Sequence, residues 1–227
     1  MQLGEKEKIL FVHMPKAAGQ SVLQFVREGI FKGSDSNWLY IGNPDEERVF
    51  ESMETGDLQR MAFLGGHVSL SAFRRKVPSL KDSHYIFTIL REPFERALSL
   101  YRYIRGYPPH FMHKDILGLS FIEFLNSQFF PRNHQCYLIQ KNAGSSEAID
   151  AALQHFDLIG FYDDLNVVTT ALSNQFSCNK ATLPMVNKSE FAVHLSNSEE
   201  AEARDIISIV DSEDVLLYEA LHATCPR

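Results

Sequence analysis

The chain has 227 residues, of which 44% are hydrophobic and 22% are charged, a composition typical of a globular protein and not of a disordered one. Asp and Glu outnumber Lys and Arg by 29 to 22, so the net charge is −7 and argues against a general nucleic-acid-binding surface. The three cysteines, Cys136, Cys178 and Cys225, contain no C-x-x-C pair, so neither a zinc site nor structural disulfides are expected.

No linker divides the sequence, and residues 1–227 are predicted to form a single domain. The first eight residues, MQLGEKEK, are polar, and no apolar run approaches the roughly 20 residues of a membrane span. We therefore expect a cytoplasmic enzyme with no membrane partner. Its oligomeric state cannot be inferred.

The first predicted unit is a strand, a basic loop and a helix. Ile9–Val12 form an apolar run typical of a parallel strand covered on both faces, and Pro15 ends it. A helical pattern begins at Gly19, and Gly29 is placed to end that helix.

The loop between them lies at a helix N-terminus, where free N–H groups and the helix dipole favour a phosphate or a similar oxyanion. Lys16 adds a positive charge, and its small neighbours let a ligand approach the backbone. The predicted anion-binding loop consists of Lys16, Ala17, Ala18, Gly19, Gln20 and Ser21.

Residues 32–60 are polar and are interpreted as a loop followed by a short helix. Apolar runs at 61–64 and 85–90 predict two strands, and Pro93 suits the first position of a helix that ends near Gly106. Further elements are predicted as helices at 120–128, 147–155 and 165–176, a strand at 156–161, and two helices after Ser196 that separate near Asp211.

Strands that alternate with helices predict an α/β fold of three layers, with a central, mainly parallel sheet flanked by helices. Ligands of such sheets bind beyond the carboxyl ends of the strands. Lys16, His67 and Arg91 each follow a predicted strand, so one cleft is expected to hold all three.

The loop does not have the nucleoside triphosphatase order G-x-x-x-x-G-K-[ST], because its lysine precedes its glycine. It resembles the 5′-phosphosulfate loop of the family-2 sulfotransferases, which include the heparan sulfate 2-O-sulfotransferases and many short bacterial proteins. The animal carbohydrate sulfotransferases carry an N-terminal membrane anchor, and the polar start of this sequence departs from them, so the resemblance implies a bacterial origin. That family usually has Thr or Ser where this chain has Gln20. An ordinary βα turn with a surface lysine is the alternative interpretation.

A second segment, LREPFERALSLY, resembles the 3′-phosphate-binding motif of the same family, in which an arginine at a strand end and a serine eight residues later hold the phosphate. Arg91 and Ser99 match it. An arginine fork grips a phosphate with two hydrogen bonds, and the hydroxyl adds a neutral donor. A surface charge and a spacer are the alternative.

His67, in GGHVSL, resembles the glycine-histidine segment of the 2-O-sulfotransferases, whose histidine is the proposed base. Neutral imidazole suits that role near pH 7. A structural histidine is the alternative, and His13 and Glu92 are other candidate bases. Lys188 lies where family members often carry a basic loop over the nucleotide, although a solvated lysine fits equally well.

The resemblance implies a P-loop-like transferase that moves a sulfuryl group, in line and without a metal, from 3′-phosphoadenosine-5′-phosphosulfate (PAPS) to a hydroxyl of a small molecule or carbohydrate. The product nucleotide would be the 3′,5′-bisphosphate (PAP). A small-molecule kinase is one alternative, but it would need a magnesium-binding Ser or Thr after the loop lysine. A non-catalytic nucleotide-binding domain is another.

Overall fold

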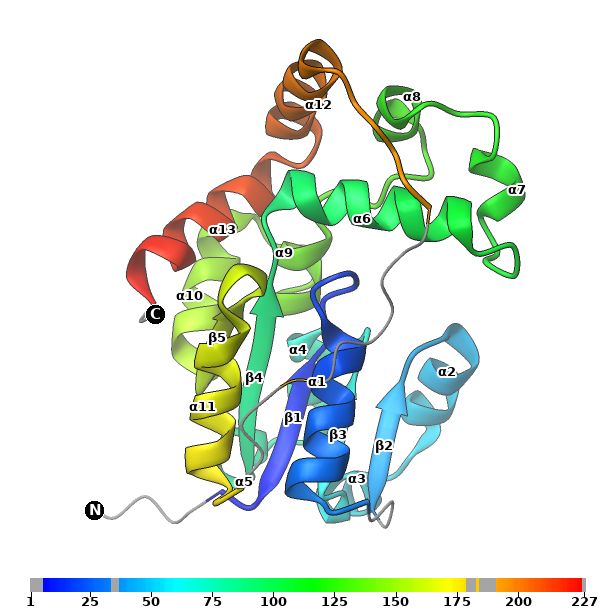
Figure 1. Ribbon diagram of the computed structural model, residues 1–227. Helices are drawn as coiled ribbons and strands as arrows, with labels where there is room; N and C mark the ends of the chain where they lie inside the picture. Colours follow the sequence, from blue (N-terminus) through cyan, green and yellow to red (C-terminus); the bar gives the residue numbers. More distant parts are fainter. Residues whose placement is uncertain (1–5, 34–36, 179–182, 184–190, 226–227) are drawn as a thin grey trace.

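The computed structural model describes residues 6–33, 37–178, 183 and 191–225. Five strands form one sheet in the order β2-β3-β1-β4-β5, and every pairing is parallel. Helices cover both faces of the sheet (Figure 1), which confirms the predicted three-layer α/β fold. The strands are β1 (Lys8–Val12), β2 (Trp38–Ile41), β3 (Phe63–Gly66), β4 (His84–Leu90) and β5 (Leu158–Phe161).

Strand β1 lies at the centre of the sheet. Leu10 pairs with Leu64 of β3 on one side and with Ile86 of β4 on the other. All four residues of Ile9–Val12 are fully buried, because β1 has neighbours at both edges and helices on both faces. This burial explains why the strand is a continuous apolar run and does not alternate.

The flanking helices are distributed as right-handed crossovers require. In Figure 1, α1 (Gly19–Phe25) and α11 (Leu165–Gln175) lie over the front face, and α4, α9 and α10 lie behind the sheet. The bounds of the helices behind are Leu70–Lys76 for α4, Leu80–Ser83 for the short α5 that precedes β4, His134–Ile139 for α9 and Ser145–His155 for α10.

Helix α6 (Pro93–Gly106) crosses beyond the carboxyl ends of the strands, below α7, α8 and α12 in the view of Figure 1. It starts at Pro93, as predicted, and its apolar face packs with these helices in a second hydrophobic cluster. The bounds are His113–Ile116 for α7, Phe121–Asn126 for α8 and Asn197–Val210 for α12. Capping boxes begin α8 at Ser120 and α12 at Ser196, which confirms both signals.

The last helix, α13 (Ser212–Thr224), packs against α9 and α10. Between it and α6 lies a buried ionic cluster, in which Arg96, Asp211 and Asp214 are all fully buried. The Arg96 guanidinium lies 3.1 Å from a carboxylate oxygen of Asp211 and 3.5 Å from one of Asp214. Asp214 also accepts hydrogen bonds from the backbone N–H groups of Gln135 and Cys136, at 2.9 and 2.8 Å. The C-terminal helices therefore fix the segment that begins α9.

Several predicted boundaries were wrong. Residues 32–60 contain strand β2 and two helices, α2 (Pro44–Ser52) and α3 (Thr55–Arg60), in place of a loop and one short helix. Gly29 does not end the first helix, because α1 continues through a π-helical turn to Ile30. Strand β3 begins at Phe63 and extends to Gly66, whose φ of 138° is rare for any residue with a side chain.

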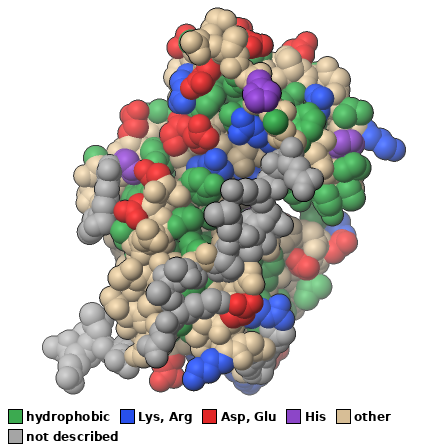
Figure 2. Space-filling view, viewed as in Figure 1, with side chains coloured by type: hydrophobic (Ala, Val, Ile, Leu, Met, Phe, Trp, Pro, Cys, Tyr) green, Lys and Arg blue, Asp and Glu red, His purple; other side chains and the backbone are tan. Residues whose placement is uncertain are grey.

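Acidic and basic side chains are interspersed over the face seen in Figure 2. Within the described ranges, no helix combines the length and apolar character needed to cross a membrane. Whether residues 1–227 form a single domain stays a prediction.

Candidate functional site

The predicted anion-binding loop follows the carboxyl end of β1. Lys16 and Ala18 have φ values of 71° and 63°, so two left-handed residues turn the chain into α1 at Gly19. No side chain caps α1 in the described structure. The loop therefore leads into a helix N-terminus without a side-chain cap, a position that favours anions.

Lys16 is partly buried beneath α6. Its ammonium lies 4.0 Å from the centroid of the Tyr103 ring, and no carboxylate of the described residues lies within ion-pair distance of it. Burial, helped by the charge of Arg91, lowers the Lys16 pKa to about 8. The lysine is therefore still charged at neutral pH and has no counter-ion, so a bound anion would relieve the cost of burying it.

Arg91 follows β4, the neighbour of β1, and contacts the loop directly. Its Nη1 donates a hydrogen bond of 3.0 Å to the backbone oxygen of Lys16, and its guanidinium lies 3.9 Å from the centroid of the Tyr162 ring. A weaker contact of 3.4 Å joins it to Glu95. The buried Nε has no partner among the described residues. One donor of the guanidinium is therefore unsatisfied in the described structure.

The backbone of Arg91 is held by Gln135. The Gln135 side-chain oxygen accepts from the Arg91 N–H at 3.0 Å, and its amide nitrogen donates to the Arg91 carbonyl at 3.0 Å. Since Asp214 holds the backbone of Gln135, the arginine is connected to the buried ionic cluster through two well-formed contacts.

Ser99 lies on α6 between Glu95, which contacts Arg91, and Tyr103, which contacts Lys16. Glu95, Ser99 and Tyr103 are spaced four residues apart in α6, so they share one face of the helix. Glu95 reaches Arg91 at one end of this face, and Tyr103 reaches Lys16 at the other. The Ser99 hydroxyl makes no hydrogen bond to the residues that the structure describes, so it can donate to a ligand held by Arg91.

His67 follows β3 and belongs to a cluster of three rings with His13 and Tyr40. Its Nδ1 lies 2.9 Å from the backbone oxygen of His13, so this nitrogen carries the proton and Nε2 keeps the lone pair. The Tyr40 hydroxyl lies 3.4 Å from His67 Nε2 and 2.5 Å from His13 Nδ1. The rings of His13 and His67 are 4.4 Å apart between centroids.

Burial keeps this cluster neutral. It lowers the pKa of His67, although the hydrogen bond to His13 and the charge of Glu46 oppose the shift. Burial, together with the charges of His67 and Lys16, holds the pKa of His13 well below its usual value. Burial raises the pKa of Tyr40. His67 is therefore an unprotonated imidazole at pH 7, as a general base must be.

A model of the sulfotransferase family matches the sequence over residues 3–189, which is more than half of the chain. The chain belongs to the sulfotransferase family.

The fold of this sulfotransferase has solved counterparts. It aligns with the crystal structure of a sulfotransferase from Alicyclobacillus acidocaldarius over 95% of this chain and 96% of that one, with 14% identity and a TM-score of 0.50. A second match is the mouse sulfotransferase SULT7A1 complexed with PAP, at 13% identity and a TM-score of 0.46. It covers 89% of this chain, which spans only 64% of the mouse chain. No curated protein sequence matches significantly.

In the sulfotransferase, Lys16 and Arg91 are in direct contact. Ser99 lies on α6 between Tyr103 and Glu95, the residues of that helix that contact Lys16 and Arg91. His67 lies in the ring cluster at the ends of β1, β2 and β3, so the sheet order gathers the predicted residues at one edge. Lys188 lies outside the described residues. Glu92 is a helix cap, since its carboxylate accepts from the backbone N–H groups of Phe94 and Glu95, which argues against its role as a base.

Four residues near the site were not predicted to take part in it. Tyr40 and Tyr103 contact the candidate catalytic residues, and Tyr162 stacks on Arg91. His134, at the start of α9, is near enough to His67 and Arg96 for their charges to add to burial in lowering its pKa to about 3. Tyr162 follows β5 directly, a position at which the rule of strand carboxyl ends could have found it.

Proposed function

We propose that this sulfotransferase uses PAPS as its donor and transfers the sulfuryl group directly to a hydroxyl of a small molecule or carbohydrate. The observation that carries the proposal is the hydrogen bond between Arg91 and Lys16, because it couples two cationic sites at adjacent strand ends. PAPS carries two anionic groups on one ribose, a 5′-phosphosulfate and a 3′-phosphate. Two neighbouring cationic sites match that pattern.

In this proposal, residues 16–21 hold the 5′-phosphosulfate through the first amides of α1 and the Lys16 ammonium. Arg91 and Ser99 hold the 3′-phosphate. PAPS therefore lies along α6. Its 5′-phosphosulfate is at Lys16, which contacts Tyr103 of that helix, and its 3′-phosphate is at Arg91, which contacts Glu95. Lys188 remains a candidate for a further contact with the nucleotide.

The transfer step forms one bond and breaks another. The acceptor oxygen attacks sulfur, the bond from sulfur to the bridging phosphate oxygen breaks, and PAP leaves. His67 Nε2 takes the acceptor proton, since Nδ1 is committed to the His13 carbonyl. Lys16 stabilises the negative charge that grows on the bridging oxygen, an interaction stronger in the transition state than in the ground state. The proposal assigns no metal ion to this step, because the Lys16 ammonium supplies the positive charge at the bridging oxygen.

The alternatives make different demands. A kinase would need a magnesium-binding hydroxyl directly after the loop lysine, where this chain has Ala17. A nucleotide-binding domain without activity would need no base, yet His67 is neutral and has its lone pair on the edge that faces Tyr40.

Calorimetric titration with PAP and AMP tests the donor site. PAP should bind much more tightly than AMP, and Arg91→Ala should narrow the difference. Arg48→Ala, which removes an exposed arginine paired with Asp45, is the matched control and should leave it unchanged. Equal affinity for the two nucleotides would overturn the 3′-phosphate site, and magnesium-dependent ATP binding would favour a kinase. Turnover of radiolabelled PAPS with a pooled metabolite extract separates an enzyme from a binding domain.

A further inference from the structure

A cationic cavity lies away from the carboxyl ends of the strands, behind the sheet. It has a volume of about 200 Å³ and is formed where the end of α10 faces α4 and α5. Its lining residues are Arg74, Pro78, Leu80, Lys81, Ile86, Gln154 and His155. Ile86 is near the start of β4 and Arg91 just beyond its end, a separation of roughly 16 Å at about 3.3 Å per residue. The cavity is therefore distinct from the site proposed for PAPS.

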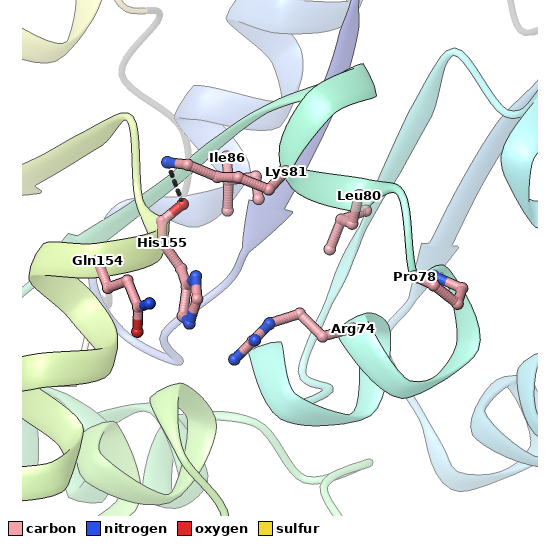
Figure 3. A pocket seen from close by; sticks show the side chains of 7 residues that line it. All are labelled: Arg74, Pro78, Leu80, Lys81, Ile86, Gln154 and His155. Atoms are coloured by element: carbon pink, nitrogen blue, oxygen red, sulfur yellow. Dashed lines mark hydrogen bonds between the residues drawn. The ribbon is translucent and has the colours of Figure 1, made fainter.

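Three polar side chains point into this space from two sides. Figure 3 shows the Arg74 guanidinium directed toward the His155 ring, with the Gln154 amide beside that ring. Arg74, in the last turn of α4, has no ion pair or hydrogen bond to the described residues. His155 is only 8% exposed, and its ring also makes no hydrogen bond to them. The ring nitrogens of His155 border the cavity, where a ligand can reach them.

The charges around His155 are positive. Arg74 and Lys81 both lower its pKa, in addition to burial. Lys81 donates to the His155 backbone oxygen at 3.0 Å, the dashed line in Figure 3, and lies 3.3 Å from the Asp157 carboxylate. Asp157 also pairs with Lys6 at 2.7 Å, so this carboxylate is already shared by two lysines. In a chain with a net charge of −7, this local excess of positive charge indicates a site for an anion.

We propose that this cavity binds the tetrahedral oxyanion of a phosphate or sulfate group. The Arg74 fork, the His155 ring and the Gln154 amide supply donors from both sides of the anion, and the apolar walls at Pro78, Leu80 and Ile86 exclude water from one side. The group can belong to the free ion or to a monoester, whose organic part would lie against those walls. This proposal is independent of the donor assigned to the active site.

Histidine ring NMR on the full chain gives a readout specific to this cavity, with the His155 signal assigned from His155→Asn. Addition of inorganic phosphate should shift that signal and raise the pKa of His155. Arg74→Gln should weaken the binding about tenfold or more, since it removes a charge-assisted contact. Arg75→Gln is the matched control, because Arg75 has the same charge on the next residue but pairs with Glu51 at 2.9 Å.

Lys16→Ala should leave the His155 response unchanged, which separates this cavity from anion binding at the loop. Parallel titrations with inorganic sulfate and glycerol phosphate distinguish the free ion from a monoester, and tighter binding of the ester would assign the apolar walls to its organic part. An unmoved His155 signal overturns the proposal. So does a response that survives Arg74→Gln, or one that Arg75→Gln weakens equally, because the effect would then be general charge screening.

Discussion

The guanidinium of Arg91 donates a hydrogen bond of 3.0 Å to the backbone oxygen of Lys16, 75 residues away in sequence. The contact exists because β1 and β4 are neighbours in the sheet, so the residues that follow them meet at one edge. The anion-binding loop is thus joined to the proposed 3′-phosphate site by this hydrogen bond. Substitutions at the two positions should therefore be non-additive in donor affinity.

Replacement of Lys16 by alanine should lower kcat by about 10²–10³-fold, the usual effect of removing one group that stabilises transition-state charge. Donor binding should weaken as well. Steady-state kinetics measure both parameters, and Lys141→Ala, a lysine over the exposed ring of Tyr137, is the matched control. An unchanged kcat with a raised KM would mean that Lys16 acts in ground-state binding only.

His67→Ala should reduce turnover by about 10²–10⁴-fold, the range of general-base catalysis, with PAP affinity nearly intact. Because burial lowers the His67 pKa, the wild-type rate should rise with pH through a value below 6.5 and then level off. His222→Ala, in α13, is the control. Retained turnover with a lower melting temperature would make His67 structural and would leave His13 as the next residue to test.

Gly19→Ala should disturb the cluster of His13, Tyr40 and His67. A Cβ at this position would lie 1.6 Å from His13 Nε2, an overlap that the buried ring can relieve only by leaving its position in the cluster. We expect a large loss of turnover and a lower melting temperature by circular dichroism. Gly56→Ala is the control, since its Cβ meets nothing within 4 Å, and it should gain up to about 1 kcal/mol of helix stability. Wild-type turnover of Gly19→Ala would mean that the His13 position does not matter.

The free energy of unfolding should fall on mild acidification because His84 is buried in its neutral form. Burial and the charge of Lys8 lower the pKa of His84 to about 4, and its Nε2 has no hydrogen-bond partner among the described residues. The unfolded chain takes up this proton near pH 6.5, so the contribution is complete above 6.5 and is lost as pH falls toward 4, on the order of 3 kcal/mol in all.

Urea unfolding of the wild type and His84→Gln over this pH range measures that contribution. The comparison is needed because Asp214 acts in the opposite direction, since burial raises its pKa to about 6. The variant should show a flatter loss of stability than the wild type. Parallel curves would contradict the assignment to His84.

The parts of the site that are local in sequence were predictable. The loop 16–21 and the pair Arg91 and Ser99 are short motifs, and each is positioned by the strand or helix that contains it. Strand β2 was missed because WLYI is only four residues long in a polar region and does not alternate. Without β2, Tyr40 could not be assigned to the ring cluster.

Other contacts depend on the order of strands, which hydrophobic patterns do not specify. Tyr40, His13 and His67 meet because β2, β3 and β1 are successive neighbours in the sheet. Gln135 reaches Arg91 only because Asp214, from the last helix, holds the backbone at the start of α9. No pattern in the segment NHQCYL indicates a partner about 80 residues further along the chain, so this support for Arg91 could not be predicted.

The central position of β1 also sets the order of events while the chain is being synthesised. Ile9 is synthesised before its partners on the two sides, Phe63 and Tyr85. Both edges of an apolar strand therefore stay unpaired until much of the sheet has been made, and unpaired edges are templates for aggregation. Such long-range pairing also slows folding. The strand that carries the anion-binding loop is thus the segment of the nascent sheet that waits longest for its partners.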